Sequence, residues 1–413
     1  MTRVLDMAAK GWPSAWWGRP VDSIGGENLN VGRGDLPLPV LTLCREAVDH
    51  NITVMAGWCK AHGVSLAPHI KTSLAPDLIR RQMTAGAWGA TVSNARQAHI
   101  AVQGGAQRLL VANEIIDPHD LDYLLALQRE GRAAVAVFVD SPEGLAVLDA
   151  AAARCGLRID VLIEIGAPGV RTGVRDRTAF LGLLDRVTNS RHVDLAGVSA
   201  FEGVLARAPD PHAPDPMRAF VWRVGDMVEE ALDRDLLQPG TVLSAGGSIG
   251  FDLVAERFGN LGLSIVLRSG CYLTHDHGLY QRASPLSRPA SQESVPDRLT
   301  PALELWAHVV SVPEPGLAIA SFGRRDANEE AGRPLPLAIV DPAGDRRPVD
   351  GWVVDRMWDQ HARLVAASGA PSLKVADVIV FGISHPCTVM DKWRWISEID
   401  RDLNVVSAVG TWF

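Results

Sequence analysis

The stretch AVAVFVDSPEGLAVLDAAAARCGLRIDVLIEIG, residues 134–166, holds two short β-rich runs on either side of a longer helical segment. The first run covers residues 134–140 and the second covers residues 158–166. Both runs are apolar on both faces, as expected for strands of a parallel sheet that is covered by helices. The stretch therefore predicts a β-α-β unit, in which a helix connects two parallel strands.

The same alternation extends from about residue 64 to residue 270. The candidate strands cover residues 64–70, 89–93, 108–113, 134–140, 158–166, 194–201, 241–247 and 264–270. Most of the segments between them have helical spacing: one begins with Asp117 and Pro118 and stops at Gly131, which is how a capped helix begins and ends. Eight such units in about 220 residues predict a single closed (β/α)8 TIM barrel rather than a doubly wound sheet.

The character of the sequence changes after Tyr280. Residues 281–301 are rich in Ser, Pro and Arg and are predicted to form a linker or surface loop. Strand-like pieces with hardly any helix between them follow over residues 302–312, 316–323, 335–341, 351–357, 376–384 and 404–413. We therefore expect a barrel over residues 36–282 and an antiparallel β domain over residues 283–413, with residues 1–35 and their three tryptophans packing on the β domain.

The composition of the chain limits the kinds of partner that it is expected to bind. The chain has 413 residues, of which 47% are hydrophobic, and a formal net charge of −8, which argues against a nucleic-acid or anionic-membrane partner. The sequence also lacks an apolar run of the length that a membrane span needs. The cysteines follow no paired pattern, so we expect reduced thiols in a cytoplasmic protein. They are Cys44, Cys59, Cys155, Cys271 and Cys387.

Catalytic groups of a TIM barrel lie at the carboxyl ends of its strands. Lys71 follows the first predicted strand, and the glycines Gly246 and Gly247, with Ser248, follow the seventh. Backbone N–H groups of such a loop form an anion cradle. Although an isolated lysine is usually a surface charge, a lysine together with a phosphate site is what a pyridoxal-phosphate enzyme needs: the amine forms a Schiff base with the cofactor and serves as the base at Cα.

Two further residues have a functional and a structural interpretation. Arg171 follows the fifth predicted strand among three glycines, so it is either directed into the barrel toward the pyridine nitrogen or is a loop arginine that binds a carboxylate. His69 projects from the same side as Lys71 and either supports the cofactor or packs in the core. The sequence leaves both pairs of interpretations open.

Several segments of the sequence resemble one known family. The chain resembles the fold-type III pyridoxal-phosphate enzymes of the D-threonine aldolase and D-serine dehydratase group, which includes bacterial amino acid deaminases. The resemblance extends over most of the chain and rests on PHIKTS (68–73), VRTGV (170–174), SAGGS (244–248), LRSGCYL (267–273) and GISHPCTVMDKWR (382–394). Two positions depart from the family pattern, since Ser73 replaces a frequent histidine and Phe201 replaces a tyrosine.

The resemblance implies roles for particular residues. Lys71 is implied to be the Schiff-base lysine, with His69 and Arg171 near the cofactor. The phosphate is implied to be held by the loop residues Ser244, Gly246, Gly247 and Ser248, and Tyr272 to contact the phosphate or the substrate. His385 and Cys387 are implied to be metal ligands in the β domain.

The spacing of the metal pair bears on the reaction. If His385 and Cys387 lie on an extended strand, both side chains project to one face. A thiolate ligand favours zinc, and two protein ligands leave positions for water and substrate. This arrangement suits a pyridoxal-phosphate- and zinc-dependent dehydratase that eliminates the β-hydroxyl of an amino acid, yielding a keto acid and ammonia. The resemblance implies a small D-amino acid such as D-serine as the substrate. The related aldolases typically have aspartate in place of Cys387.

Several alternatives stay open. The same barrel fold also occurs in three other kinds of protein. They are an aldolase, an amino-acid racemase with a second base and no metal, and a non-catalytic pyridoxal-phosphate carrier. The segment THDHG, with His275, Asp276 and His277, is either a separate metal site or a polar loop. By resemblance we also expect a homodimer.

Overall fold

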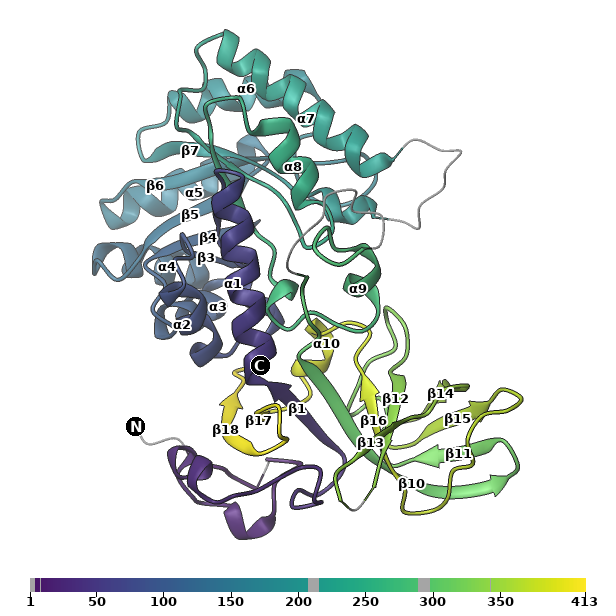
Figure 1. Cartoon of the computed structure of the whole chain (residues 1–413). Helices are drawn as coiled ribbons and strands as arrows, with labels where there is room; N and C mark the ends of the chain where they lie inside the picture. Colours follow the sequence, from purple (N-terminus) through teal and green to yellow (C-terminus); the bar gives the residue numbers. More distant parts are fainter. Residues whose placement is uncertain (1–3, 8, 207–214, 289–297, 342) are drawn as a thin grey trace. The chain divides into compact units, whose positions relative to one another are not determined.

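The computed structural model of the chain describes residues 4–7, 9–206, 215–288, 298–341 and 343–413. The chain divides into two compact units. Residues 55–270 form one, here called the barrel unit, and the residues up to 54 together with residues 271–413 form the other, here called the β unit (Figure 1). The expected linker over residues 281–301 lies partly outside the described residues, since its central part, residues 289–297, is not described.

The barrel unit is built on an eight-stranded parallel sheet with the order β2-β9-β8-β7-β6-β5-β4-β3. Each strand predicted from the sequence is present, most of them shorter than predicted. Their bounds are β2 Ser65–Leu66, β3 Ala90–Val92, β4 Arg108–Glu114, β5 Ala134–Val139, β6 Ile159–Ile165, β7 Val193–Ala200, β8 Val242–Ser244 and β9 Ser264–Leu267. Together with the β unit, this sheet confirms the expected (β/α)8 TIM barrel with an additional antiparallel β domain.

The first and last strands of this order are joined by a short seam. The Trp88 amide donates to the Leu66 carbonyl at 2.8 Å, and the Thr91 amide donates to the Pro68 carbonyl at 3.0 Å. His69 and Thr91 form an isolated parallel bridge. β2 is short because the chain turns into the 3-10 helix η3 (Ile70–Thr72) soon after Leu66, and this turn carries Lys71 to the carboxyl-end rim of the barrel.

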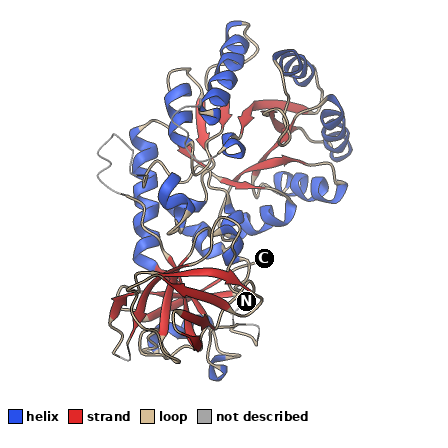
Figure 2. Cartoon of the chain, turned by 90° about the vertical axis from the view of Figure 1, so that its right-hand side faces the viewer, coloured by secondary structure: helices blue, strands red, loops and turns tan. Residues whose placement is uncertain are grey.

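Helices cover the outer face of the barrel sheet (Figure 2). They are α2 Pro76–Thr84, α3 Ala95–Gln103, α4 Pro118–Arg129, α5 Pro142–Cys155, α6 Arg177–Thr188, α7 Pro216–Asp233 and α8 Phe251–Phe258, and α1 (Arg45–Ala61) extends from the β unit into the barrel unit. Asp117 caps α4 as predicted, with Oδ1 accepting from the amides of His119 and Asp120 at 2.8 and 3.2 Å. Gly131 follows this helix with φ +66°, a conformation that favours glycine.

The interior of the barrel is filled by apolar side chains. One buried cluster takes a residue from or next to each of β2, β4, β5, β6 and β9, namely Ala67, Leu110, Phe138, Leu162 and Val266. Packing of this kind is typical of TIM barrels, whose interior is a core and not a pore. Functional groups therefore have to lie at the rim, above this layer.

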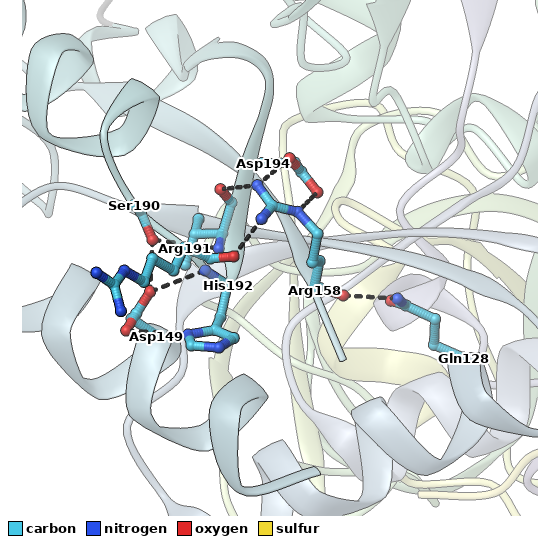
Figure 3. Close-up of polar contacts among 8 residues, drawn as sticks. Gln128, Asp149, Arg158, Ser190, Arg191, His192 and Asp194 are labelled. Carbon is cyan, nitrogen blue, oxygen red and sulfur yellow. Dashed lines mark hydrogen bonds and ion pairs between the residues drawn. The ribbon is translucent and has the colours of Figure 1, made fainter. Parts of the chain in front are cut away.

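Polar contacts tie the amino ends of β6 and β7 together (Figure 3). The Arg158 guanidinium makes two hydrogen bonds to the Asp194 carboxylate, at 2.6 and 2.5 Å. Asp149 of α5 contacts the turn before β7, where its carboxylate accepts from the Ser190 hydroxyl at 2.5 Å and from the His192 amide at 3.1 Å. Polar groups at this end of a TIM barrel serve stability and not catalysis.

The β unit contains ten described strands. They are β1 Val40–Cys44, β10 Leu303–Glu314, β11 Leu317–Ala320, β12 Leu335–Val340, β13 Arg346–Pro348, β14 Trp352–Met357, β15 Ala362–Ala366, β16 Val378–Gly382, β17 Trp395–Ile399 and β18 Val405–Gly410. The first half of β10 pairs with β1 and β16, and its second half pairs with β11. Most pairs are antiparallel, but β1 and β17 are parallel.

Residues before β1 pack into the core of this same unit. Leu5, Trp12, Trp16 and Ile24 belong to one buried cluster with Trp306 of β10 and with side chains of β16, β17 and β18.

A charged contact reinforces this packing. Lys10 Nζ donates to Asp326 Oδ1 at 2.8 Å and lies 3.9 Å from the centre of the Trp393 ring. The amino-terminal segment is thus part of the β unit's core.

The helices in the described part of the chain include none that is both long and apolar enough to cross a membrane.

Candidate active site and metal pair

Lys71 lies at the carboxyl-end rim of the barrel, in the middle of η3. Its side chain is exposed, and its amide donates a long hydrogen bond of 3.5 Å to Nδ1 of the half-buried His69. Burial lowers the pKa of His69 well below its ordinary value, and the positive charges of Lys71, Arg268 and Arg171 lower it further. His69 is therefore neutral at neutral pH, and the three cationic side chains lie near enough to affect its pKa.

Arg268 is the buried guanidinium of this group. It follows β9, is 7% exposed, and its Nη2 donates to the Ala200 carbonyl at 2.8 Å. Its Nη1 donates to Ser244 Oγ at 2.9 Å and also to the Ser244 carbonyl, and the guanidinium lies 5.3 Å from the centre of the Phe138 ring. Burial lowers the pKa of Arg268 to about 10, so it keeps its charge at neutral pH and presents it at the top of the barrel core.

The glycine loop after β8 binds an oxyanion within the chain itself. Gly246 has φ +89°, and the amides of Gly246 and Gly247 donate to the carboxylate of Glu202 at 3.2 and 2.6 Å. Glu202 is 1% exposed and begins η4 (Glu202–Leu205) after β7. Ser248 lies half-buried in the same loop, just before α8. The loop thus has the anion-binding donors that the sequence predicted, although a carboxylate already accepts from them.

Arg171 lies in a folded loop after β6. Its side chain is exposed, and its guanidinium lies 5.4 Å from the centre of the Phe201 ring. The loop is held by Gly173, which has φ +103° and donates its amide to Asp140 Oδ2 at 2.9 Å. Glu164, Arg171 and Phe201 line a small hollow at this end of β6. The structure therefore places Arg171 over an aromatic ring and makes Arg268 the buried arginine.

Three carboxyl groups lie near one another at the ends of adjacent strands. Glu114 ends β4, Asp140 follows β5, and Glu164 lies in β6 and is 4% exposed. Burial raises the pKa of Glu114 to about 8, with the charges of Glu164 and Asp140 adding to the effect. Glu114 is therefore largely protonated at neutral pH, which limits the negative charge beside the cationic group.

The predicted metal pair lies in the β unit. The expectation of an extended strand is wrong: β16 ends at Gly382, Pro386 has helical angles of φ −77° and ψ −31°, and Cys387 begins the short helix α10 (Cys387–Met390). The ring of His385 lies 5.5 Å from that of Tyr280. The Sγ atoms of Cys387 and Cys271 are 3.3 Å apart.

Few candidate metal ligands lie in this region. Among the described residues, no group of three or more His, Cys, Asp or Glu side chains converges to hold a metal ion. Nδ1 of His385 is buried and has no hydrogen-bond partner. An unsatisfied imidazole nitrogen two residues from a thiol in the sequence is chemically suited to a soft metal such as zinc, which would need water or substrate to complete its ligands.

The segment with His275, Asp276 and His277 has a structural role. The Asp276 carboxylate accepts from the amides of Gly278 at 2.8 Å and Tyr280 at 2.9 Å, at the start of α9 (Leu279–Ala283). His275 contacts Gln281 Oε1 through Nε2 at 3.1 Å. This segment is therefore a capped polar turn and agrees with the second interpretation of the sequence. Tyr272, in η5 (Cys271–Leu273), is 3% exposed and belongs to the same unit.

Comparisons with known proteins agree with this architecture. The model of the alanine racemase N-terminal domain matches residues 43–259, and the "Putative serine dehydratase domain" model matches residues 302–399. The chain belongs to the fold-type III pyridoxal-phosphate enzymes. The first match spans more than half of the chain and includes Lys71 and the glycine loop, while the second includes His385 and Cys387.

Individual relatives of this fold-type III enzyme are lyases. The chain is 28% identical to D-threonine aldolase of Arthrobacter sp over 311 residues, which are 74% of this chain and 76% of the relative. It is 33% identical to D-threo-3-hydroxyaspartate dehydratase of Delftia sp. (strain HT23) over 180 residues, 43% of this chain and 46% of the relative. The crystal structure of D-threonine aldolase from Filomicrobium marinum superposes with a TM-score of 0.78 at 25% identity, covering 93% of this chain and 97% of that one. The chain is thus a lyase of the pyridoxal-phosphate-dependent class.

The barrel rim of this fold-type III enzyme fits its cofactor. The amides of the glycine loop already bind a carboxylate. A Cβ on Gly247 would lie 2.7 Å from the Phe201 ring, so this loop conformation depends on glycine. Two side chains to which the sequence gave no role, Glu202 and Arg268, are central here. Glu202 lies directly after the predicted strand 194–201, and Arg268 lies near the end of the predicted strand 264–270. The strand-end rule therefore contained both residues, but their burial and partners come from the fold.

Proposed function

We propose that this enzyme is a D-serine dehydratase-like ammonia-lyase, which eliminates the β-hydroxyl of a small D-β-hydroxy amino acid to give a 2-keto acid and ammonia. The observation that carries the proposal is the pair His385 and Cys387, within the segment that matches the serine dehydratase domain. The Lys71 amine at the rim of the barrel supplies the base. Together these residues supply proton removal and assistance to a poor leaving group, which are the two needs of β-elimination.

The barrel residues take the following parts in this proposal. Pyridoxal 5'-phosphate, when bound, supplies the electron sink that makes the Cα proton removable. Lys71 bonds to the cofactor and, once released, takes that proton. The neutral His69 supports the lysine segment because its Nδ1 accepts a hydrogen bond from the Lys71 amide. Ser244, the last residue of β8, and the loop residues Gly246, Gly247 and Ser248 bind the phosphate in this proposal. The resemblance adds Tyr272 as a candidate contact.

An arginine opposite the pyridine nitrogen would keep that nitrogen unprotonated. Arg268, which is buried and fixed by Ser244 and Ala200, suits this role better than Arg171. Arg171 is exposed and lies over Phe201, which places its charge at the mouth of the site, where it can bind the substrate's carboxylate. A fixed guanidinium is a stronger tuning group than a mobile one because no reorganisation is needed.

We further propose that His385 and Cys387 hold Zn²⁺. The ion would act there as a Lewis acid toward the substrate's β-hydroxyl. The buried, unsatisfied Nδ1 of His385 and the sulfur of Cys387 supply one imidazole and one thiolate, a soft set that favours zinc over magnesium or manganese.

The second candidate is the retro-aldol reaction, which cleaves the Cα–Cβ bond of the same class of substrate. It is favoured by the D-threonine aldolase relative, which matches a longer part of the chain than the dehydratase does. The cysteine at position 387 favours dehydration. A racemase needs a second base and no metal, so the metal pair argues against it.

The deciding experiment identifies products. The full-length protein, supplied with the cofactor and zinc, is incubated with D-serine, D-threonine and a D-3-hydroxyaspartate, each beside its L isomer. We expect keto acid and ammonia from D isomers, none from L isomers, and none from Lys71→Ala. Glycine plus an aldehyde as the main products would show an aldolase instead of a dehydratase. Interconversion of D and L isomers would show a racemase instead of either.

Two properties of the assembled enzyme complete the proposal. We propose a homodimer, as is usual for fold-type III enzymes, and a cytoplasmic location, which agrees with five cysteines that form no disulfide in the structure. The partner is a small D-amino acid rather than a nucleic acid or a membrane, in keeping with the net charge of −8. Sedimentation analysis of the purified protein tests the dimer.

A further inference from the structure

Two cysteines that are 116 positions apart in the sequence meet in the β unit. Cys271 and Cys387 have their Sγ atoms 3.3 Å apart. The proposed reaction needs only one of them, because Cys271 is neither the lysine, nor a phosphate donor, nor part of the His385 and Cys387 pair. The close contact of a second thiol therefore needs an explanation of its own.

The two cysteines lie in short helical segments of the β unit. Cys271 is 6% exposed and begins η5, while Cys387 is half-buried and begins α10. The ring of Tyr280 lies beside His385 at 5.5 Å, and the amide of Tyr280 is fixed by the carboxylate of Asp276. A disulfide bond of about 2.05 Å requires these sulfur atoms to approach by only about 1.2 Å. Small side-chain rotations within a fixed frame provide a movement of that size.

We propose that Cys271 and Cys387 form an oxidation site at which a peroxide converts the two thiols into a disulfide. The more exposed Cys387 reacts first: its sulfur attacks one peroxide oxygen, the O–O bond breaks, and the products are a sulfenic acid and water. The sulfur of the buried Cys271 then attacks the sulfenic sulfur and displaces a second water. In total, two thiols and hydrogen peroxide give one disulfide and two waters.

The same sulfur atom links this site to the metal pair. Once Cys387 is part of a disulfide it can no longer act as a thiolate ligand, and once it binds a metal its sulfur is shielded from the peroxide. Oxidation and metal binding therefore exclude each other. This exclusion rests on the proposed function, whereas the disulfide itself depends only on the two sulfur atoms.

The test treats the metal-free full-length protein with hydrogen peroxide and maps its cysteines by mass spectrometry without reduction. We expect a mass loss of about 2 Da and a cross-linked peptide that joins Cys271 to Cys387. In Cys271→Ser and Cys271→Ala, whose folding is checked by circular dichroism, the mass loss disappears and Cys387 instead gains oxygen, by about 32 Da as sulfinic acid. Cys155→Ser is the matched control and should behave like the wild type.

Other outcomes separate the two parts of the inference. Oxygen addition at Cys387 in the wild type without a disulfide, or a disulfide between other cysteines, overturns the oxidation site. With zinc bound, we expect the disulfide to form at least about tenfold more slowly. An unchanged rate in protein that contains one bound zinc per chain overturns the exclusion. If no zinc binds and the disulfide still forms, the proposed metal function fails while the oxidation site stands.

Discussion

Glu202 accepts a hydrogen bond of 2.6 Å from the amide of Gly247, so a buried carboxylate occupies one of the donors that a cofactor phosphate would use. The neighbouring Gly246 amide donates to the same carboxylate at 3.2 Å. A phosphate that approaches this loop meets a negative charge at hydrogen-bonding distance from the shared donors. We therefore expect Glu202 to influence how tightly the loop binds an anion.

We predict that Glu202→Gln binds pyridoxal phosphate more tightly than the wild type, by roughly threefold to tenfold, which is about 0.7 to 1.4 kcal/mol. The neutral amide removes the repulsion and keeps an acceptor oxygen for the loop. The measurement is a titration followed by the visible absorbance of the bound cofactor. Glu229→Gln, at a carboxylate paired with Arg257 in the same unit, is the matched control. Weaker binding would show instead that the carboxylate holds the loop in its binding shape.

Lys71→Ala should lose the covalent bond to the cofactor completely. Its side chain is the amine at the rim of the barrel, and alanine has no nucleophile to replace it. After borohydride reduction, wild-type peptides that contain residue 71 should carry the cofactor mass and the variant should carry none. Lys60→Ala, at an exposed lysine near the end of α1, should keep the label on residue 71. A label that survives in Lys71→Ala would move the cofactor to another amine.

Glu114→Gln should change the pH dependence of stability. The pKa of Glu114 is raised from 4.5 to about 8 by burial and by Glu164. A carboxyl with a raised pKa holds its proton more tightly in the folded state, so its contribution is full below pH 4.5 and is lost as pH rises toward 8. Glutamine stays neutral, so cofactor-free Glu114→Gln should gain stability relative to the wild type between pH 5 and pH 8.

Urea midpoints at several pH values measure this difference. Glu143→Gln, at an exposed carboxyl in the first turn of α5, should follow the wild type over the whole range. A Glu114→Gln difference that is constant from pH 5 to pH 8 would mean that Glu114 titrates normally in the folded protein.

Asp149→Ala should destabilise the barrel and leave catalysis unchanged. The carboxylate accepts from the Ser190 hydroxyl and the His192 amide at the amino end of β7 (Figure 3). Because the side chain is 36% exposed, the expected loss in the free energy of unfolding is only about 1 kcal/mol. Asp122→Ala, whose carboxylate has one 3.3 Å contact to Arg154, should lose clearly less. A changed kcat in Asp149→Ala would contradict its assignment to stability.

His385→Ala should lose bound zinc. Removing one of two protein ligands should weaken zinc binding by at least about tenfold, measured as zinc per chain after dialysis against a competing chelator. His361→Ala, at an exposed histidine of the same unit, should retain the wild-type zinc content. Equal zinc in both variants would remove His385 from the ligand set.

The sequence predicted most of the barrel because the relevant signals are local. Apolar runs such as 158–166 became β6, and the capping Asp117 and the stop at Gly131 delimit α4. All eight strands were predicted at the right places, although most of them were predicted too long. Short apolar runs rich in β-branched residues favour a strand over a helix at that length. β1 escaped prediction because its partners, β10 and β17, lie more than 250 residues away.

The candidate site also combines residues that local sequence signals mark with contacts that only the fold decides. The sequence by itself predicted Lys71, the glycine loop and the pair His385 and Cys387 as candidate site residues, because a strand end or a motif marks each of them. Tertiary structure alone decided that Glu202 occupies the loop amides, that Arg268 and not Arg171 is buried, and that Cys271 meets Cys387. These relationships depend on distances between residues far apart in the chain, which are fixed only when burial and packing bring their elements together.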